Sequence, residues 1–74
     1  MDKEKIFKKF GKSIKTIRLE IGLSQEEAAS KSELDRSYFG AIERGEHNVS
    51  LWNICKISKG LDVPISALFK EFDE

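Results

Sequence analysis

Residue types that start and stop helices recur at short intervals along this chain, and their spacing leaves room only for short helices after the first. Gly22 and Gly45 stand where a helix prefers to end with a positive φ angle. Ser24, Asp35 and Ser50 are residue types that cap helix N-termini. These signals predict five helical segments, at about residues 3–21, 25–32, 36–44, 51–60 and 65–72.

Apolar residues within these segments repeat at helical spacing. In the first segment the intervals of three and four residues place them on one side of a helix. These residues are Ile6, Phe10, Ile14, Ile17 and Ile21. Leu51, Ile54 and Leu61 form a similar face in the fourth segment, and Pro64 fits the opening of the fifth. No strand pattern, repeat or linker interrupts the chain, so the sequence predicts an all-α fold, a compact five-helix domain over residues 1–74.

The second and third segments are two short helices joined by a tight turn. Ser24 and Glu27 have the spacing of a capping box, which marks the start of the second segment. Gly40 lies inside the third segment, where glycine costs about 1 kcal/mol relative to alanine. We expect Ala28 and Ala29 to approach Gly40 closely, because all three residues are small. Two short helices with about three residues between them are typical of helix-turn-helix geometry.

The 74 residues contain a single cysteine and a single histidine, which excludes several classes of protein. Cys55 cannot form an internal disulfide, and His47 alone cannot build a metal site, so no cofactor is expected. No apolar run approaches the roughly 20 residues of a membrane-spanning helix, and no signal-peptide core follows the N-terminal lysines. We expect a cytoplasmic protein without a membrane partner. The core of so short a chain is thin, which favours a homodimer.

The net charge is zero and the pI is about 6.6, but the charge is divided unevenly along the chain. Residues 1–22 hold seven Lys or Arg and three Asp or Glu, a net charge of +4. The net charge is −3 over residues 23–49 and −1 over residues 50–74. The basic segment has two interpretations. It is either the solvated face of an amphipathic helix or a surface that attracts phosphates.

Three segments, LSQEEAA at 23–29, LDRSY at 34–38 and IERG at 42–45, resemble the phage repressor and Cro-like helix-turn-helix family. Within that family the chain looks most like the controller proteins of restriction-modification systems. The sequence departs from the family pattern at Ala28, Glu33, His47 and Val49. Glu33 occupies the turn, where the family often has Gly or Asn. Either the turn differs from that of the family, or Glu33 takes a positive φ angle at a cost of roughly 1 kcal/mol.

The first turn of the third segment carries the side chains that we expect to contact DNA bases. Arg36 has a planar guanidinium that matches guanine O6 and N7, and we predict that it is the main base-contacting residue. Ser37 can donate or accept a hydrogen bond, and Tyr38 can contact a phosphate or a thymine methyl group. The alternative for Arg36 is a surface ion pair with Asp35 or Glu33.

Other residues are predicted to contact the DNA backbone. The resemblance implies that Gln25 positions a phosphate at the start of the second segment, and that His47 and Asn48 hold phosphates from the following loop. A solvated loop histidine is the alternative for His47. Arg18 and the lysines of the first segment are expected to attract phosphates without sequence preference. Glu43 is interpreted as a structural residue, because phosphates repel a carboxylate.

An apolar set near the C-terminus is the predicted dimer interface. Its members are Val63, Ile65, Leu68, Phe69 and Phe72. A two-fold contact there places two DNA-contacting helices about 34 Å apart, which requires a pseudo-palindromic operator. The alternative is that all five side chains belong to the core of one protomer. The role of Trp52 is left open.

These observations favour a DNA-binding regulator over two other classes. An enzyme is not expected, because the sequence offers no nucleophile near a base, no paired carboxylates and no phosphate-binding glycine loop. No small-molecule ligand is evident. A stand-alone phage repressor or an antitoxin-type protein-binding module is the remaining alternative, although little follows the fifth segment to cover a toxin. The resemblance implies a homodimeric controller of a restriction-modification operon that binds double-stranded DNA at its own promoter, activating first and repressing when a second dimer binds.

Overall fold

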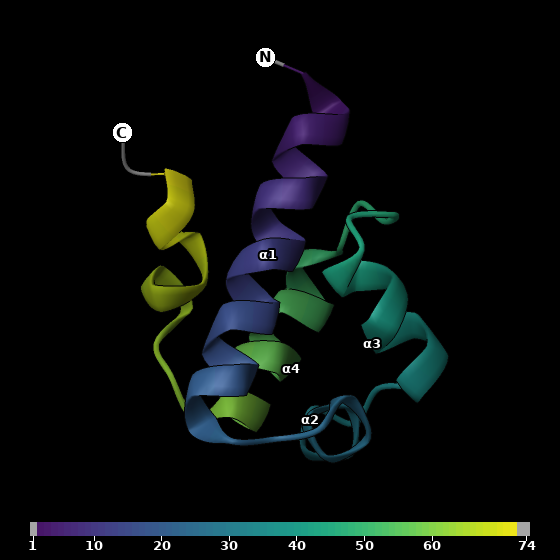
Figure 1. Ribbon diagram of the computed structural model, residues 1–74, viewed down its shortest axis with the longest axis vertical. Helices are drawn as coiled ribbons and strands as arrows, with labels where there is room; N and C mark the ends of the chain where they lie inside the picture. Colours follow the sequence, from purple (N-terminus) through teal and green to yellow (C-terminus); the bar gives the residue numbers. More distant parts are fainter. Residues whose placement is uncertain (1, 73–74) are drawn as a thin grey trace.

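The computed structural model describes residues 2–72, and over this range every regular element is a helix. The elements are α1 (Lys3–Ile21), α2 (Gln25–Lys31), α3 (Arg36–Glu43), α4 (Leu51–Leu61) and the 3₁₀ segment η1 (Ile65–Phe72). Figure 1 shows α1 along the long axis of the molecule, with α3 on one side and η1 on the other. The prediction of an all-α fold with five helical segments is confirmed. The last segment differs from an ordinary α-helix, since Phe69 has non-helical angles of φ −115° and ψ 16° and kinks it.

Side-chain caps begin the four α-helices. The carboxylate of Asp2 accepts a hydrogen bond from the amide of Glu4 at 2.9 Å and caps α1. Ser24 and Glu27 form the predicted capping box of α2, with reciprocal hydrogen bonds of 3.0 and 2.9 Å. Asp35 caps α3 and Ser50 caps α4, both as predicted. Because each cap satisfies amides that have no partner within the helix, these residues fix where the helices start.

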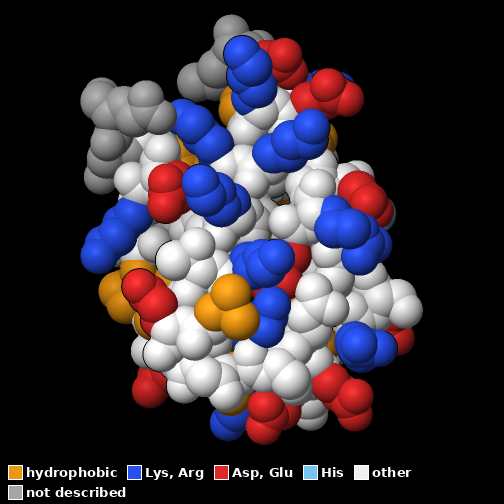
Figure 2. All heavy atoms as spheres, viewed as in Figure 1, with side chains coloured by type: hydrophobic (Ala, Val, Ile, Leu, Met, Phe, Trp, Pro, Cys, Tyr) orange, Lys and Arg blue, Asp and Glu red, His pale blue; other side chains and the backbone are white. Residues whose placement is uncertain are grey.

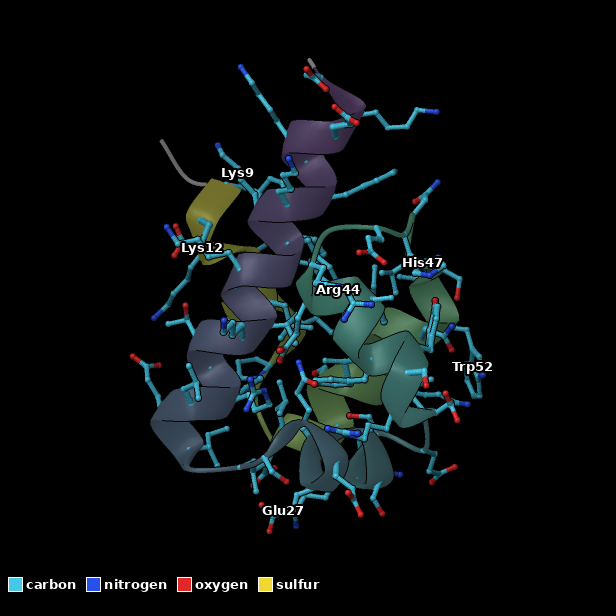
Figure 3. The ribbon with its side chains drawn as sticks, turned by 45° about the vertical axis from the view of Figure 1, so that its right-hand side comes forward. Lys9, Lys12, Glu27, Arg44, His47 and Trp52 are labelled. Atoms are coloured by element: carbon cyan, nitrogen blue, oxygen red, sulfur yellow. The ribbon has the colours of Figure 1, made fainter. Side chains whose placement is uncertain are left out.

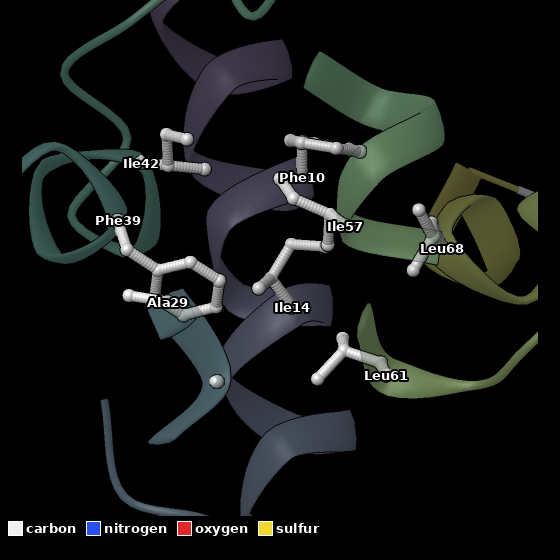
Figure 4. Packing of buried hydrophobic residues seen from close by; sticks show 9 residues of the cluster. Phe10, Ile14, Ala29, Phe39, Ile42, Ile57, Leu61 and Leu68 are labelled. Atoms are coloured by element: carbon white, nitrogen blue, oxygen red, sulfur yellow. The ribbon is translucent and has the colours of Figure 1, made fainter. Parts of the chain in front are cut away.

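The core lies where all four α-helices and η1 face one another, and Figure 4 shows most of its side chains. Its buried apolar residues are Phe10, Ile14, Ala28, Ala29, Phe39, Ile42, Ile57, Leu61 and Leu68. The apolar stripe predicted for the first segment supplies Phe10 and Ile14, whereas Ile17 is only partly buried. Ile21, at the end of that stripe, is 47% exposed. None of the helices within residues 2–72 is both long and apolar enough to cross a membrane.

Two glycines allow close packing around α3. A Cβ atom at Gly11 of α1 would overlap the carbonyl oxygen of Ile42 and would lie 2.6 Å from that of Glu43, so α1 meets the backbone of α3 directly. A Cβ atom at Gly40 would lie 3.3 Å from Nη1 of Arg44 and 3.4 Å from Oε1 of Gln25. Helix α2 does approach Gly40, as expected, but it does so through the side chain of Gln25, and Ala28 and Ala29 are not among the nearest groups. Long polar side chains lie over this glycine instead.

The turn between α2 and α3 keeps a left-handed residue. Glu33 has a φ angle of 55°, and the amide of Leu34 donates to the carbonyl of Ala29 at 2.9 Å. The sequence left two alternatives, a different turn or a positive φ angle at Glu33, and the structure shows the positive φ angle. The positive φ angle of a non-glycine residue costs about 1 kcal/mol here.

Candidate nucleic-acid interface

Helices α2 and α3 are joined by four residues, and α3 presents its N-terminal turn to solvent. Arg36 and Ser37 are both exposed. The carboxylate of Asp35 accepts a hydrogen bond from the amide of Ser37 at 3.0 Å. Within residues 2–72, Arg36 forms no salt bridge with Asp35 or Glu33, so the ion-pair alternative is not observed. The guanidinium of Arg36 is available to an external acceptor.

Tyr38 connects α3 to the loop that follows it and to α4. Its hydroxyl accepts a hydrogen bond from Nδ2 of Asn53 at 3.2 Å, and its ring centroid lies 5.0 Å from that of His47. His47 and Asn48 are exposed in this loop, and Figure 3 shows His47 beyond the end of α3. The structure therefore brings Tyr38 and His47 together. Asn53 was missed, because its partner Tyr38 lies fifteen residues away and local sequence does not reveal the contact.

Arg18 does not belong to this surface. Its side chain is buried, and its Nε and Nη2 atoms donate to Glu43 at 2.6 and 3.1 Å. Its Nη1 atom donates to the carbonyl of Leu23 at 2.9 Å. The prediction that Arg18 attracts phosphates is wrong, because each guanidinium nitrogen already has a partner inside the protein. The sequence carries a signal for this: Arg18 follows Ile14 by four residues and so shares its buried side.

Glu43 is the acceptor at the centre of a buried polar cluster, in agreement with its interpretation as a structural residue. Besides Arg18 it accepts a hydrogen bond from Nε2 of Gln25 at 2.9 Å. Gln25 is half-buried, and its Nε2 atom is already engaged by Glu43 within the protein. The cluster connects α1, α2 and α3 and holds the exposed face of α3 in a fixed orientation.

A second ion pair lies at the exposed end of α3. Arg44 donates through Nε and Nη2 to the two carboxylate oxygens of Glu46, at 2.8 and 3.3 Å. Both side chains are more than half exposed. The hydrogen bonds from Arg44 and its positive charge lower the pKa of Glu46. The same hydrogen bonds raise the pKa of Arg44. Arg44 thus pairs with Glu46, whereas its neighbour Glu43 pairs with Arg18.

Arg44 shares one shallow hollow with several residues of the predicted site. The hollow is lined by Gln25, Arg36, Ser37, Gly40 and Arg44. Lys and Arg side chains spread over the face shown in Figure 2, with acidic side chains among them. The lysines of α1 are exposed, apart from the half-buried Lys9. The side chains that line the hollow supply hydrogen-bond donors, and the lysines of α1 supply positive charge; contact with nucleic acid requires both.

The family model described as Helix-turn-helix matches residues 14–68. The chain belongs to the helix-turn-helix family. Control protein C.MunI of Mycoplasma sp is 45% identical over 67 residues, which cover 89% of this chain and 90% of that protein. The crystal structure of the restriction-modification controller protein C.AhdI from Aeromonas hydrophila superposes with a TM-score of 0.86 at 48% identity, covering 88% of this chain and 98% of that one. The structure of C.Esp1396I bound to a 25 base pair operator site gives a TM-score of 0.82 at 40% identity and covers 93% and 96% of the two chains.

The apolar residues predicted to form a dimer interface are mostly packed within this helix-turn-helix protomer. Leu68 is completely buried, so its assignment to an accessible interface is wrong. The Phe69 ring packs against Phe10 and Phe72, with centroid distances of 5.3 and 5.5 Å. Val63 is partly buried against the core, and Ile65 alone is well exposed, at 42%. The sequence analysis placed Phe69 and Phe72 in the dimer interface, because local sequence does not reveal the contact of Phe69 with Phe10 of α1.

Other apolar side chains of the helix-turn-helix protein are more exposed than the predicted set. Leu51 and Trp52, at the start of α4, are 73% and 71% exposed. Figure 3 shows Trp52 pointing outward at the edge of the molecule. Nζ of Lys56 lies 5.7 Å from the centroid of the Trp52 ring. Leu51 and Trp52 follow the loop of His47 and Asn48, so they lie close in sequence to the candidate interface.

Proposed function

We propose that this protein is a sequence-specific transcriptional regulator that binds double-stranded DNA in the cytoplasm, and that it controls a restriction-modification operon from its own promoter region. The observation that supports this most directly is the first turn of α3, where the side chains of Arg36 and Ser37 are exposed at the surface of a helix-turn-helix. A helix of eight residues is about 12 Å long, and an α-helix fits the major groove of B-DNA.

The contacts divide into base and backbone contacts. Arg36 is assigned to a guanine, because its guanidinium can donate two parallel hydrogen bonds to O6 and N7. Ser37 and Tyr38 follow Arg36 and are assigned to neighbouring bases or phosphates. His47 and Asn48 are assigned to phosphates beside the groove. Base contacts of this kind supply sequence preference, and phosphate contacts fix the position of the protein on the duplex.

The regulator acts as a homodimer on a pseudo-palindromic operator. We assign the dimer contact to the C-terminal part of the chain, where Val63 is half-buried and Ile65 is 42% exposed in the protomer. A two-fold contact there is expected to leave both copies of α3 free to enter successive major grooves on one side of the duplex. The half-sites are then about 34 Å apart.

Selection of binding sites from a randomised duplex pool tests this function. We expect enrichment of an inverted repeat with half-sites about 10 base pairs apart. Arg36→Ala should lose about 1–3 kcal/mol of binding free energy on the selected site and relax the preference at one base position. Glu71→Gln, at an exposed carboxylate of η1, is the control and should keep the preference.

Two results would count against the proposal. A pool without an enriched motif would remove the DNA-binding function and favour a protein partner. An unchanged base preference in Arg36→Ala would remove the role given to Arg36. Methyltransferase and endonuclease genes next to the coding sequence are expected for a restriction-modification controller, and toxin or phage genes in that position would contradict this assignment.

A further inference from the structure

The turn after α3 fixes the relative positions of Arg44 and Glu46 through the backbone. The amide of Gly45 donates to the carbonyl of Ile42, and the amide of Glu46 donates to that of Ala41, each at 3.0 Å. Gly45 has a φ angle of 77°. This pattern is a Schellman motif, which closes the C-terminus of a helix with a left-handed residue. The two side chains on either side of Gly45 are thereby held close enough to form their ion pair.

Arg44 lies on the same exposed stripe of α3 as Arg36. Arg36, Gly40 and Arg44 are spaced by four residues, and all three line the hollow described above. The missing side chain at Gly40 leaves room for the guanidinium of Arg44, whose Nη1 is 3.3 Å from the position of a Cβ atom there. Glu46 engages Nε and Nη2 of Arg44. Arg44 is therefore placed beside the predicted base-contacting residue but has its charge neutralised.

The ion pair contributes little to folding, because both side chains are more than half exposed and such a pair is screened by water and salt. It has a larger effect on an approaching phosphate. Arg44 has to exchange a carboxylate oxygen for a phosphate oxygen, and the carboxylate of Glu46 also repels the phosphate.

We propose that Glu46 limits the affinity of this protein for DNA by pairing with Arg44, so that tight binding depends on the base contacts of α3. The inference depends on the proposed function. It assigns two residues to DNA binding that the sequence did not single out: Arg44 as a phosphate-binding residue and Glu46 as the residue that restrains it.

The test measures the affinity of Glu46→Gln for a duplex of unrelated sequence across a series of salt concentrations. Neutralising one more phosphate steepens the dependence of log K on log salt by about 0.9. Over the tenfold interval from 1 M to 0.1 M salt, this corresponds to an affinity gain of about eightfold at the lower concentration. Glu71→Gln makes the same change of net charge on η1 and should leave affinity and slope nearly unchanged.

The double variant Arg44→Gln/Glu46→Gln separates the proposed pairing from a general effect of charge. We expect most of the gain of Glu46→Gln to disappear when Arg44 is replaced. An equal gain with and without Arg44 would overturn the inference, since Glu46 would then act by repulsion alone. A loss of affinity in Glu46→Gln would also overturn it, because Glu46 would then orient Arg44 for DNA. If the unchanged protein binds neither the unrelated duplex nor any selected site, the proposed function itself is wrong.

Discussion

Replacing Glu43 by Gln is expected to destabilise the protein strongly, although the two side chains have nearly the same shape. The Glu43 and Arg18 side chains are only 2% and 8% exposed, and two hydrogen bonds join them. Glutamine retains one acceptor oxygen but leaves the charge of Arg18 buried without a counter-charge. Breaking a buried ion pair by removing one partner costs about 3–5 kcal/mol. We take about 3 kcal/mol, because glutamine keeps one hydrogen bond to Arg18.

This loss is large for a chain of 74 residues, whose free energy of unfolding is expected to be roughly 4–11 kcal/mol. The corresponding fall in Tm is roughly 12–24 °C. Urea unfolding followed by far-ultraviolet circular dichroism measures the effect. Fluorescence is a poor alternative, because Trp52 is 71% exposed and its surroundings change little on unfolding. All variants must be compared at one protein concentration, since a dimer gains stability with concentration.

Two further variants show whether the charge is the cause. Glu46→Gln removes the same charge from an exposed pair and should unfold at the same urea concentration as the unchanged protein. Arg18→Met/Glu43→Leu replaces both charges by apolar groups and should recover much of the stability lost in Glu43→Gln. The reasoning is refuted if Glu43→Gln lies within about 1 kcal/mol of the unchanged protein, or if the double variant is less stable than Glu43→Gln.

Three other predictions concern the turn, the dimer and the response to pH. Glu33→Gly should raise the free energy of unfolding by about 0.5–1 kcal/mol, because glycine adopts the positive φ angle without strain; a fall in the urea midpoint would contradict this. Ile65→Glu should shift sedimentation equilibrium toward the monomer while circular dichroism stays unchanged, and a persistent dimer would exclude Ile65 from the interface. Hydrogen bonds from Ser24 lower the pKa of Glu27 below its ordinary value of 4.5. The charged form of Glu27 in the capping box therefore stabilises the folded state above pH 4.5, and this effect is lost as the pH falls through the pKa of Glu27 in the folded protein. The unchanged protein and Glu27→Gln should differ in urea midpoint at pH 7 and converge at low pH.

Local sequence signals predicted the helices well, because caps and turns depend on neighbouring residues. Ser24, Asp35 and Ser50 each begin a helix in the structure as expected. The kink of η1 at Phe69 was not foreseen, since no residue type that breaks helices stands there; in the structure the Phe69 ring packs against Phe10 of α1.

The candidate site was predicted less completely than the fold. Arg36 and Ser37 are exposed where the motif places them. The spacing of Arg18 from Ile14 indicates its buried side, but it was misassigned because its partner Glu43 lies 25 residues away and spacing along one helix does not reveal the partner. Arg44 and Glu46 were not singled out, because their pairing depends on the left-handed turn at Gly45 and on the space above Gly40.

The division of α3 into two faces has a consequence for how new operators can be acquired. Phe39, Ile42 and Glu43 attach the helix to the rest of the protein, whereas Arg36, Ser37 and Arg44 lie on its exposed side. Substitutions on the exposed side leave the buried contacts intact. A family of regulators with different target sequences can therefore diverge from one ancestral scaffold by changing a few surface positions, and a designer can exchange the same positions to retarget the protein.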